Sequence, residues 1–162
     1  MRDNIDLVIF GSQGDLAKRK LLPALYRLDK ADLLPDNARI ASVARHQIST
    51  NIYLSQVQEN LQQVIPKKEW DNKVWTRFKR RIYYIKVDFS QKKQFNHVSD
   101  WMEENRKVIF YLATPPSLYE SICKHMASTG CVSENTRIVL EKPIGHDLRS
   151  SKQVNDAVGQ YF

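Results

Sequence analysis

The feature that most constrains this chain is a short apolar run that stops at the first of two spaced glycines. Residues 5–10 read Ile-Asp-Leu-Val-Ile-Phe, and residues 11–17 follow the pattern Gly-x-x-Gly-x-x-Ala. An apolar run bounded by glycine predicts a buried strand, and the apolar spacing beyond it predicts a helix. A strand, a tight glycine turn and a helix in this order are typical of the first unit of a nucleotide-binding α/β fold.

The remaining sequence alternates between strand-like and helix-like segments. We expect strands at 39–44, 82–87, 108–113 and 137–140, and helices at about 15–28, 51–81, 91–104, 117–128 and from 148 to the terminus. The strands are continuous apolar runs, which is typical of a sheet covered on both faces. The pattern therefore predicts an α/β fold, Rossmann-like, with a doubly wound and mostly parallel sheet of about five strands.

Prolines and caps set the expected helix boundaries. Pro66 should divide 51–81 into two helices, and Pro23 should kink the first helix or shift its start. Ser117 and Glu120 have the spacing of a capping box for the helix that follows.

Composition excludes several classes of protein. The 162 residues are 42% hydrophobic and 27% charged, as in ordinary globular domains. No apolar run approaches the ~20 residues of a membrane span, and the N-terminus has no signal-peptide core. Cys123 and Cys131 are too few for a disulfide framework and lack metal-ligand spacing. We therefore expect a cytoplasmic chain with free thiols, no metal and no membrane partner.

The net charge of +7 comes from one segment, residues 67–93, which holds ten Lys or Arg and three acids. Aromatic residues interleave with these cations, a pattern that also occurs in nucleic-acid-binding proteins. The aromatics fall on helix and strand positions that a core would use. A solvated helix face or an insertion is therefore favoured, and a basic nucleic-acid-associated domain remains the weaker alternative.

The glycine turn has a specific physical interpretation. Gly11 would permit the tight turn, Gly14 would let a pyrophosphate approach the backbone, and Ala17 would let the helix pack on the strand. The helix N-terminus would then offer N–H groups and a positive dipole end to phosphates. Asp15 could favour that dipole, cap the helix or contact a cofactor. The alternative is a plain βα turn that uses glycine only for positive φ.

The end of the second predicted strand bears on the choice between NAD and NADP. Val43-Ala44 is followed by Arg45 and His46, with no acid for a ribose 2′-hydroxyl. The planar donor fork of arginine suits a 2′-phosphate, which favours NADP. A solvated surface arginine is the alternative for Arg45. His46 could touch adenine or ribose, but a solvent-exposed histidine is the favoured interpretation.

Four motifs, taken in chain order, together resemble those of a single protein family. Residues 11–26, with Gly-Asp-Leu-Ala-x-Arg-Lys-Leu-x-Pro-Ala-Leu-Tyr from Gly14, resemble the N-terminal segment of the glucose-6-phosphate 1-dehydrogenase family. Residues 137–148, Arg-Ile-Val-Leu-Glu-Lys-Pro-Ile-Gly-His-Asp-Leu, are similar to that family's Glu-Lys-Pro element. Val43-Ala44-Arg45 and residues 110–116, Phe-Tyr-Leu-Ala-Thr-Pro-Pro, match two further family elements in the same order.

This resemblance implies NADP-dependent oxidation of the C1 hydroxyl of glucose 6-phosphate to a lactone, the first step of the pentose phosphate pathway. Lys20, Lys142 and Pro143 would position the substrate, with a cis peptide at Pro143 helping to aim Lys142. The cofactor-binding residues implied by the resemblance are Gly11, Ser12, Gln13, Gly14, Asp15, Leu16, Ala17, Lys18, Arg45, Asp88, Phe89, Ala113, Thr114, Pro115 and Lys142.

The resemblance also implies what should follow this segment. The family's catalytic histidine lies in an Arg-Ile-Asp-His-Tyr-Leu-like segment that would begin shortly after Phe162, ahead of a large α+β domain with the homo-oligomer interface. We therefore expect residues 1–162 to be an incomplete NADP-binding domain, with no catalytic residue of its own and inactive alone. The last helix should expose an apolar face that includes Val154, Val158 and Phe162. A standalone dinucleotide-binding module without catalysis is the alternative.

Overall fold

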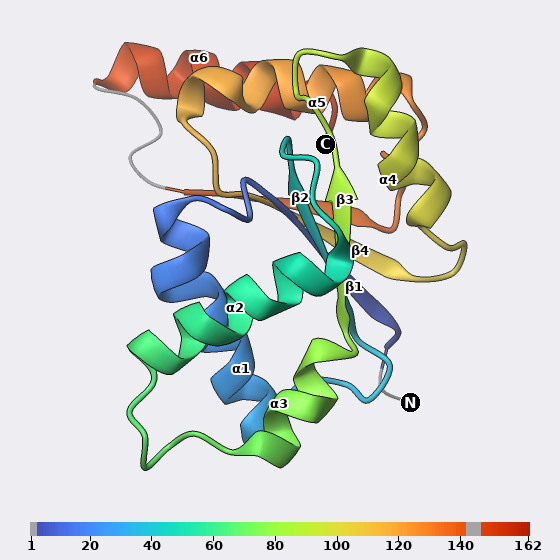
Figure 1. The fold of residues 1–162 in the computed structure, drawn as a ribbon. Coiled ribbons are helices and arrows are strands. Elements are labelled where there is room, and N and C mark those ends of the chain that lie inside the picture. The colour runs from blue at the N-terminus through green and yellow to red at the C-terminus, as the bar shows by residue number, and fades with distance from the viewer. Residues whose placement is uncertain (1–2, 142–146) are drawn as a thin grey trace.

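The fold is a single parallel β-sheet with helices on both faces, seen in a computed structural model that describes residues 3–141 and 147–162 (Figure 1). The strand order is β3-β2-β1-β4-β5. The strands are β1 (Ile5–Phe10), β2 (Arg39–Ala44), β3 (Ile82–Lys86), β4 (Lys107–Leu112) and β5 (Thr136–Leu140). The helices are α1 (Leu22–Lys30), α2 (Thr50–Val64), α3 (Asn72–Lys79), α4 (Asn96–Trp101), α5 (Tyr119–Ser128) and α6 (Leu148–Gly159).

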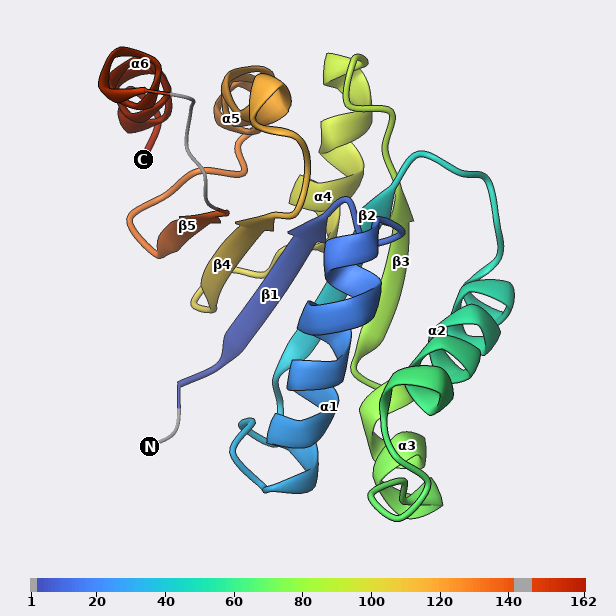
Figure 2. The same cartoon turned by 90° about the vertical axis from the view of Figure 1, so that its left-hand side faces the viewer.

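The helices are divided between the two faces of the sheet. Helices α1, α2 and α3 lie on one face, and α4, α5 and α6 lie on the other (Figure 2). The chain builds β2 and β3 outward from one side of β1, then returns to place β4 and β5 on the other side. Right-handed crossovers in these two directions put the connecting helices on opposite faces. The predicted doubly wound, Rossmann-like sheet is therefore confirmed.

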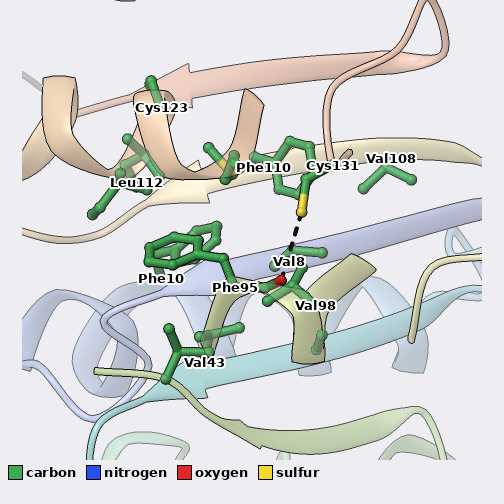
Figure 3. Packing of buried hydrophobic residues seen from close by; sticks show 14 of the residues in the cluster. Val8, Phe10, Val43, Phe95, Val98, Val108, Phe110, Leu112, Cys123 and Cys131 are labelled. Carbon is green, nitrogen blue, oxygen red and sulfur yellow. Dashed lines mark hydrogen bonds between the residues drawn. The ribbon is translucent and has the colours of Figure 1, made fainter. Parts of the chain in front are cut away.

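Alternating residues of the central strand fill two separate cores. Val8 and Phe10 face the core under α4, α5 and α6, whereas Ile9 faces the core under α1, α2 and α3. Figure 3 shows the first of these cores, where the thiol of Cys131 donates to the backbone oxygen of Phe95 at 3.8 Å. Both cysteines are buried and unpaired. Period-two alternation along β1 is what lets one strand serve both layers.

Two prolines act as expected, and one capping prediction was wrong. Helix α2 ends before Pro66, and Pro23 stands in the first turn of α1. Ser117 and Glu120 form no capping box, because the chain makes a 3₁₀ turn at Pro116–Leu118 and α5 begins only at Tyr119. The consecutive prolines restrict φ and direct the chain into this tighter turn.

The expected exposed apolar face of the last helix was also wrong. Val158 is 6% exposed, and Val154, Tyr161 and Phe162 pack partly buried against the core that α5 covers. The rings of Phe162 and Phe110 meet edge to face, with centroids 6.0 Å apart. Helix α6 therefore finds its apolar partner within the described chain.

Most of the aromatic residues of the basic segment pack into the core on the α1–α3 face, whereas Phe89 packs against the core on the other face. Trp75 and Phe78 are buried, and the ring of Trp70 stacks on Tyr26 with centroids 5.1 Å apart. Of the six aromatic residues in this segment, only Tyr83 is exposed, at 41%. The pattern that suggested base stacking is thus used for packing, as the sequence interpretation favoured.

A buried carboxylate joins the amino ends of three strand segments. Asp6 is fully buried on β1 and accepts from Arg39 Nη2 of β2 at 2.5 Å. Its other oxygen accepts from Arg106 Nε, just before β4, at 2.7 Å. This cluster lies at the sheet edge opposite the glycine turn, since all of the strands are parallel.

Candidate functional site

The candidate site lies where the parallel strands end, at the point where the strand order reverses. The chain leaves β1 at Gly11 and leaves β4 at Ala113, and the two strands are neighbours in the sheet. The Ala113 N–H donates to the Phe10 oxygen at 2.9 Å, so the ladder continues to the edge of the turn. Crevices at such reversals are where open α/β sheets bind ligands.

Gly11 is required by two independent constraints. Its φ is +86°, which L side chains rarely adopt. A Cβ atom on Gly11 would also lie 2.6 Å from the backbone oxygen of Ala113 and 3.1 Å from Cγ2 of Thr114. The predicted role of Gly11 in a tight turn is thus borne out by its geometry, with a close backbone approach added.

The turn is fastened to the neighbouring strand and leads directly into the helix. The N–H groups of Gly11 and Ser12 both donate to the Val43 oxygen of β2, at 3.0 and 3.3 Å. Gly14 N–H donates to the Gly11 oxygen, and Lys18 N–H donates to the Gly14 oxygen at 3.1 Å. A Cβ on Gly14 would meet the Gly11 oxygen at 3.2 Å, so even alanine is tight there.

The first turns of this helix are π-helical at Ala17–Leu21, before α1 begins. The Leu22 N–H donates to the Ala17 oxygen, five residues back, immediately before Pro23. Single π turns of this kind absorb local strain and are frequent at functional sites. Ala17 is fully buried in the core, consistent with its predicted packing role. The side chains of residues 18–20, Lys-Arg-Lys, are exposed on the helix beside the turn.

Asp15 is exposed two residues before the π-helical segment at Ala17–Leu21. No side-chain cap hydrogen bond forms at the start of that segment, where Leu16 is the N-cap residue. The interpretations of Asp15 as favouring the helix dipole or contacting a cofactor stay predictions.

Arg45 and His46 follow β2 and lie beside the glycine turn. Arg45 is exposed, and His46 Nδ1 lies 2.6 Å from Gln13 Oε1, which links the two loops. The pKa of Asp88, which follows β3, is lowered chiefly by hydrogen bonds from Ser90 and further by the nearby positive charge of Arg45. Asp88 is therefore held mainly by its own loop, with Arg45 within electrostatic range.

The other predicted site residues differ in where they lie and in how exposed they are. Thr114 lies against the turn, and its hydroxyl is buried without a partner among the described residues. The next residue, Pro115, is exposed. The ring of Phe89 packs into the core against Phe10, with centroids 5.7 Å apart, so only part of it is exposed. Lys142 and Pro143 lie outside the described residues, and their predicted positions relative to Lys20 stay predictions.

A cavity of about 480 Å³ lies between the turn and α2. Its lining includes Ser12, Gln13, Lys18, His46 and Tyr53. The hydroxyl groups of Ser12 and Tyr53, which line this cavity, are buried, as is that of Ser42 on β2. Burial raises the pKa of the Tyr53 phenol. The sequence interpretation missed Ser42 and Tyr53. The sequence signal that could have identified them is a hydroxyl-bearing side chain at a position where the apolar pattern predicts burial. An apolar residue there would be enough for packing.

Of the described histidines, His46 lies beside the glycine turn, and the other two contact backbone oxygens. His97 Nδ1 and His125 Nδ1 contact the backbone oxygens of Lys86 and Phe89, and His46 contacts Gln13. His146 is outside the described residues. No cluster of three or more potential metal-ligating side chains is found in residues 3–141 and 147–162. Over the same residues, no helix is both long and apolar enough to span a membrane.

A glycine turn at the strand-order reversal of a doubly wound parallel sheet defines this chain as a Rossmann-like domain of the nucleotide-binding class. Sequence comparison then assigns the particular family. Residues 8–162 match the family model described as "Glucose-6-phosphate dehydrogenase, NAD binding domain". The chain therefore belongs to the glucose-6-phosphate dehydrogenase family, through its N-terminal domain.

Individual relatives agree with this assignment. The chain is 37% identical to glucose-6-phosphate 1-dehydrogenase of Dickeya dadantii over 97% of its own length and 32% of that protein. It is 39% identical to the enzyme of Mycolicibacterium smegmatis over 99% of its length and 34% of that protein. The chain thus spans about a third of the length of these relatives.

Solved structures show the same fold. The crystal structure of glucose-6-phosphate 1-dehydrogenase from Mycobacterium avium superposes with a TM-score of 0.91 and 28% identity, over all of this chain and 35% of that one. A glucose-6-phosphate dehydrogenase in complex with its substrate is alike in fold, with a TM-score of 0.83, 24% identity, and coverage of 99% and 34%.

Proposed function

We propose that residues 1–162 form the NADP-binding domain of an NADP-dependent glucose-6-phosphate dehydrogenase. The observation that carries this proposal is the juxtaposition of the glycine turn with Ala113 and Thr114 at the strand-order reversal, with Arg45 on the adjacent loop. Family membership adds support. In this proposal the whole enzyme oxidises glucose 6-phosphate at C1 to 6-phosphogluconolactone.

The turn fits a dinucleotide on two counts. Without a Cβ at Gly11 and Gly14 the backbone closes into the tight turn that such sites use, since a Cβ would meet the oxygens of Ala113 and Gly11 at 2.6 and 3.2 Å. The buried hydroxyl of Thr114 also has no partner among the described residues, so it is available to a ligand. Backbone N–H groups at the start of the helix would receive the phosphates.

Arg45 would set the preference for NADP. Its guanidinium is exposed at the end of β2, and no acid follows that strand to accept a ribose 2′-hydroxyl. A guanidinium donates two parallel hydrogen bonds to a phosphate, which is why it discriminates a phosphorylated ribose. Gln13, held beside His46, would complete the edge of this part of the site.

The chemistry of the proposed reaction is divided between the coenzyme and the protein. Bound NADP⁺ would supply the acceptor for the hydride. In this chain Lys20, Lys142 and Pro143 would position the sugar phosphate. Loss of the C1 hydroxyl proton needs a positioned base, and the described histidines contact Gln13 or backbone oxygens in this structure. We therefore expect this segment to bind NADP without oxidising glucose 6-phosphate.

The test is calorimetric titration of the 162-residue chain with NADP and with NAD. Replacing Arg45 by alanine should weaken NADP binding by roughly 10- to 100-fold, the scale of a charge-assisted hydrogen bond, and leave NAD binding nearly unchanged. Arg80→Ala removes the same charge from an exposed position at the end of α3 and should change neither affinity. Equal losses for NADP and NAD on Arg45→Ala would contradict the coenzyme assignment.

Turnover of glucose 6-phosphate by this chain alone would contradict the expectation that the catalytic base lies outside it.

For the cellular location we propose the cytoplasm, and the two free cysteines support this.

A further inference from the structure

Three buried hydroxyl groups converge beneath the glycine turn from three different elements. Ser12 belongs to the turn, Ser42 to β2 and Tyr53 to α2, and their exposed fractions are 1%, 0% and 2%. None of the three hydroxyls makes a well-formed hydrogen bond within the described residues. Ser12 and Tyr53 line the same cavity. The hydroxyls of Ser42 and Ser12 also lower the pKa of Tyr53, which burial raises, so both serines act on the phenol.

Packing alone does not account for the phenol hydroxyl of Tyr53. The ring of Tyr53 lies in the core on the α1–α3 face and contacts the ring of Tyr84, with centroids 4.8 Å apart. Phenylalanine would provide the same ring without an unpaired polar atom, which is destabilising when buried. A buried polar group that lacks a structural partner is therefore a candidate for a functional role.

The location of the hydroxyl indicates which role. The Ser12 N–H donates to Val43 on β2, so the turn is already tied to the sheet on that side. Tyr53 approaches the same serine from α2, and both residues line the cavity of about 480 Å³. A hydrogen-bonded set forms once the side chains move so that the three hydroxyls meet, and in such a set each bond polarises and strengthens the others.

We propose that Tyr53 is a positioning residue for coenzyme binding, whose hydroxyl acts through Ser12, with Ser42, to hold the glycine turn in the conformation that receives the phosphates. This inference rests on the proposed NADP-binding function. Tyr53 itself does not touch the coenzyme. Its hydroxyl is unpaired in the chain without ligand, and the set closes as the phosphates fix the turn.

The experiment measures NADP dissociation constants and melting temperatures of the 162-residue chain. Tyr53→Phe should weaken NADP binding by about 3- to 10-fold, the scale of one hydrogen bond. Its melting temperature should be equal or higher, because the variant removes a buried unpaired hydroxyl. The matched control is Tyr26→Phe, which loses the hydrogen bonds between the phenol and the backbone of Asp71 at 2.9 and 3.2 Å. This control should melt lower and bind NADP normally.

A double-variant cycle tests the route through the turn. Ser12→Ala should weaken NADP binding to a similar degree. The variant carrying both changes should bind NADP as tightly as the single variant with the larger loss of affinity, because both changes break one connection. Ser42→Ala should act in the same direction and gives a second measurement if Tyr53→Phe does not fold.

Several results would overturn the inference. Normal NADP binding by Tyr53→Phe, or by Ser42→Ala where Tyr53→Phe does not fold, would exclude a positioning role. So would losses that multiply in the double variant, or a drop in melting temperature as large as that of Tyr26→Phe. If the unaltered chain binds no NADP, the proposed function is wrong and the inference falls with it. If the unaltered chain binds and Tyr53→Phe binds equally, only the inference is wrong.

Discussion

Replacement of Gly11 by alanine tests whether the strand-order reversal is as tightly built as the structure indicates. The φ of +86° should cost roughly 1–2 kcal/mol for a residue with a Cβ atom. The new Cβ would lie 2.6 Å from the Ala113 oxygen, where ordinary contact begins at 3.4 Å. The ends of β1 and β4 must then move apart, and overpacking of this kind costs a further ~1–3 kcal/mol. We expect a total loss of roughly 2–5 kcal/mol.

Gly130 provides a matched control within the same chain. It follows α5 with a φ of +79°, and a Cβ added there meets no atom within 4 Å. Gly130→Ala should therefore cost only the conformational part, roughly 1–2 kcal/mol. The difference between the two variants isolates the clash with Ala113.

Urea denaturation followed by circular dichroism gives the free energy of unfolding for both variants. Calorimetric titration with NADP then tests the site, which Gly11→Ala should disable and Gly130→Ala should leave intact. If the two variants lose the same free energy within about 0.5 kcal/mol, the contact with Ala113 does not constrain the turn, and our account of the reversal is refuted.

Three further predictions concern other parts of the molecule. Gly14→Ala should change the free energy of unfolding by less than ~1 kcal/mol but weaken NADP binding at least ~10-fold, because the new Cβ blocks the phosphates. An unchanged NADP affinity in calorimetric titration would contradict this. Asp6→Ala should cost ~3–5 kcal/mol in urea denaturation, because the buried Arg106 and the partly buried Arg39 lose their buried partner. Asp3→Asn at an exposed pair should change little, and similar losses in the two variants would argue against a buried cluster. Burial raises the pKa of Cys123 to about 12 and also raises that of Cys131. A thiol reagent in mildly alkaline buffer should therefore label both cysteines only after the chain unfolds. Rapid labelling of the folded chain would contradict their burial.

Local patterns in the sequence were sufficient for most of the elements. The apolar run at 5–10 and the glycines beyond it predicted β1 and its turn, because strand burial and positive φ depend on neighbouring residues. Pro66 marked the division between α2 and α3 for the same reason. Ser117 shows where this reasoning failed, since the prolines before it favour a 3₁₀ turn over the cap that its spacing suggested.

The sequence by itself thus determined the α/β class, the glycine turn and the arginine that follows β2. Only the tertiary structure decided what these features meet. It brings the Ala113 oxygen against Gly11, places Ser12 and Tyr53 on one cavity, and packs Phe162 at the end of α6 against Phe110. These partners lie far apart in the sequence, and the order of the strands and the packing of the helices bring them together. No local periodicity encodes such distant contacts, because periodicity shows which face of an element is buried and not what buries it.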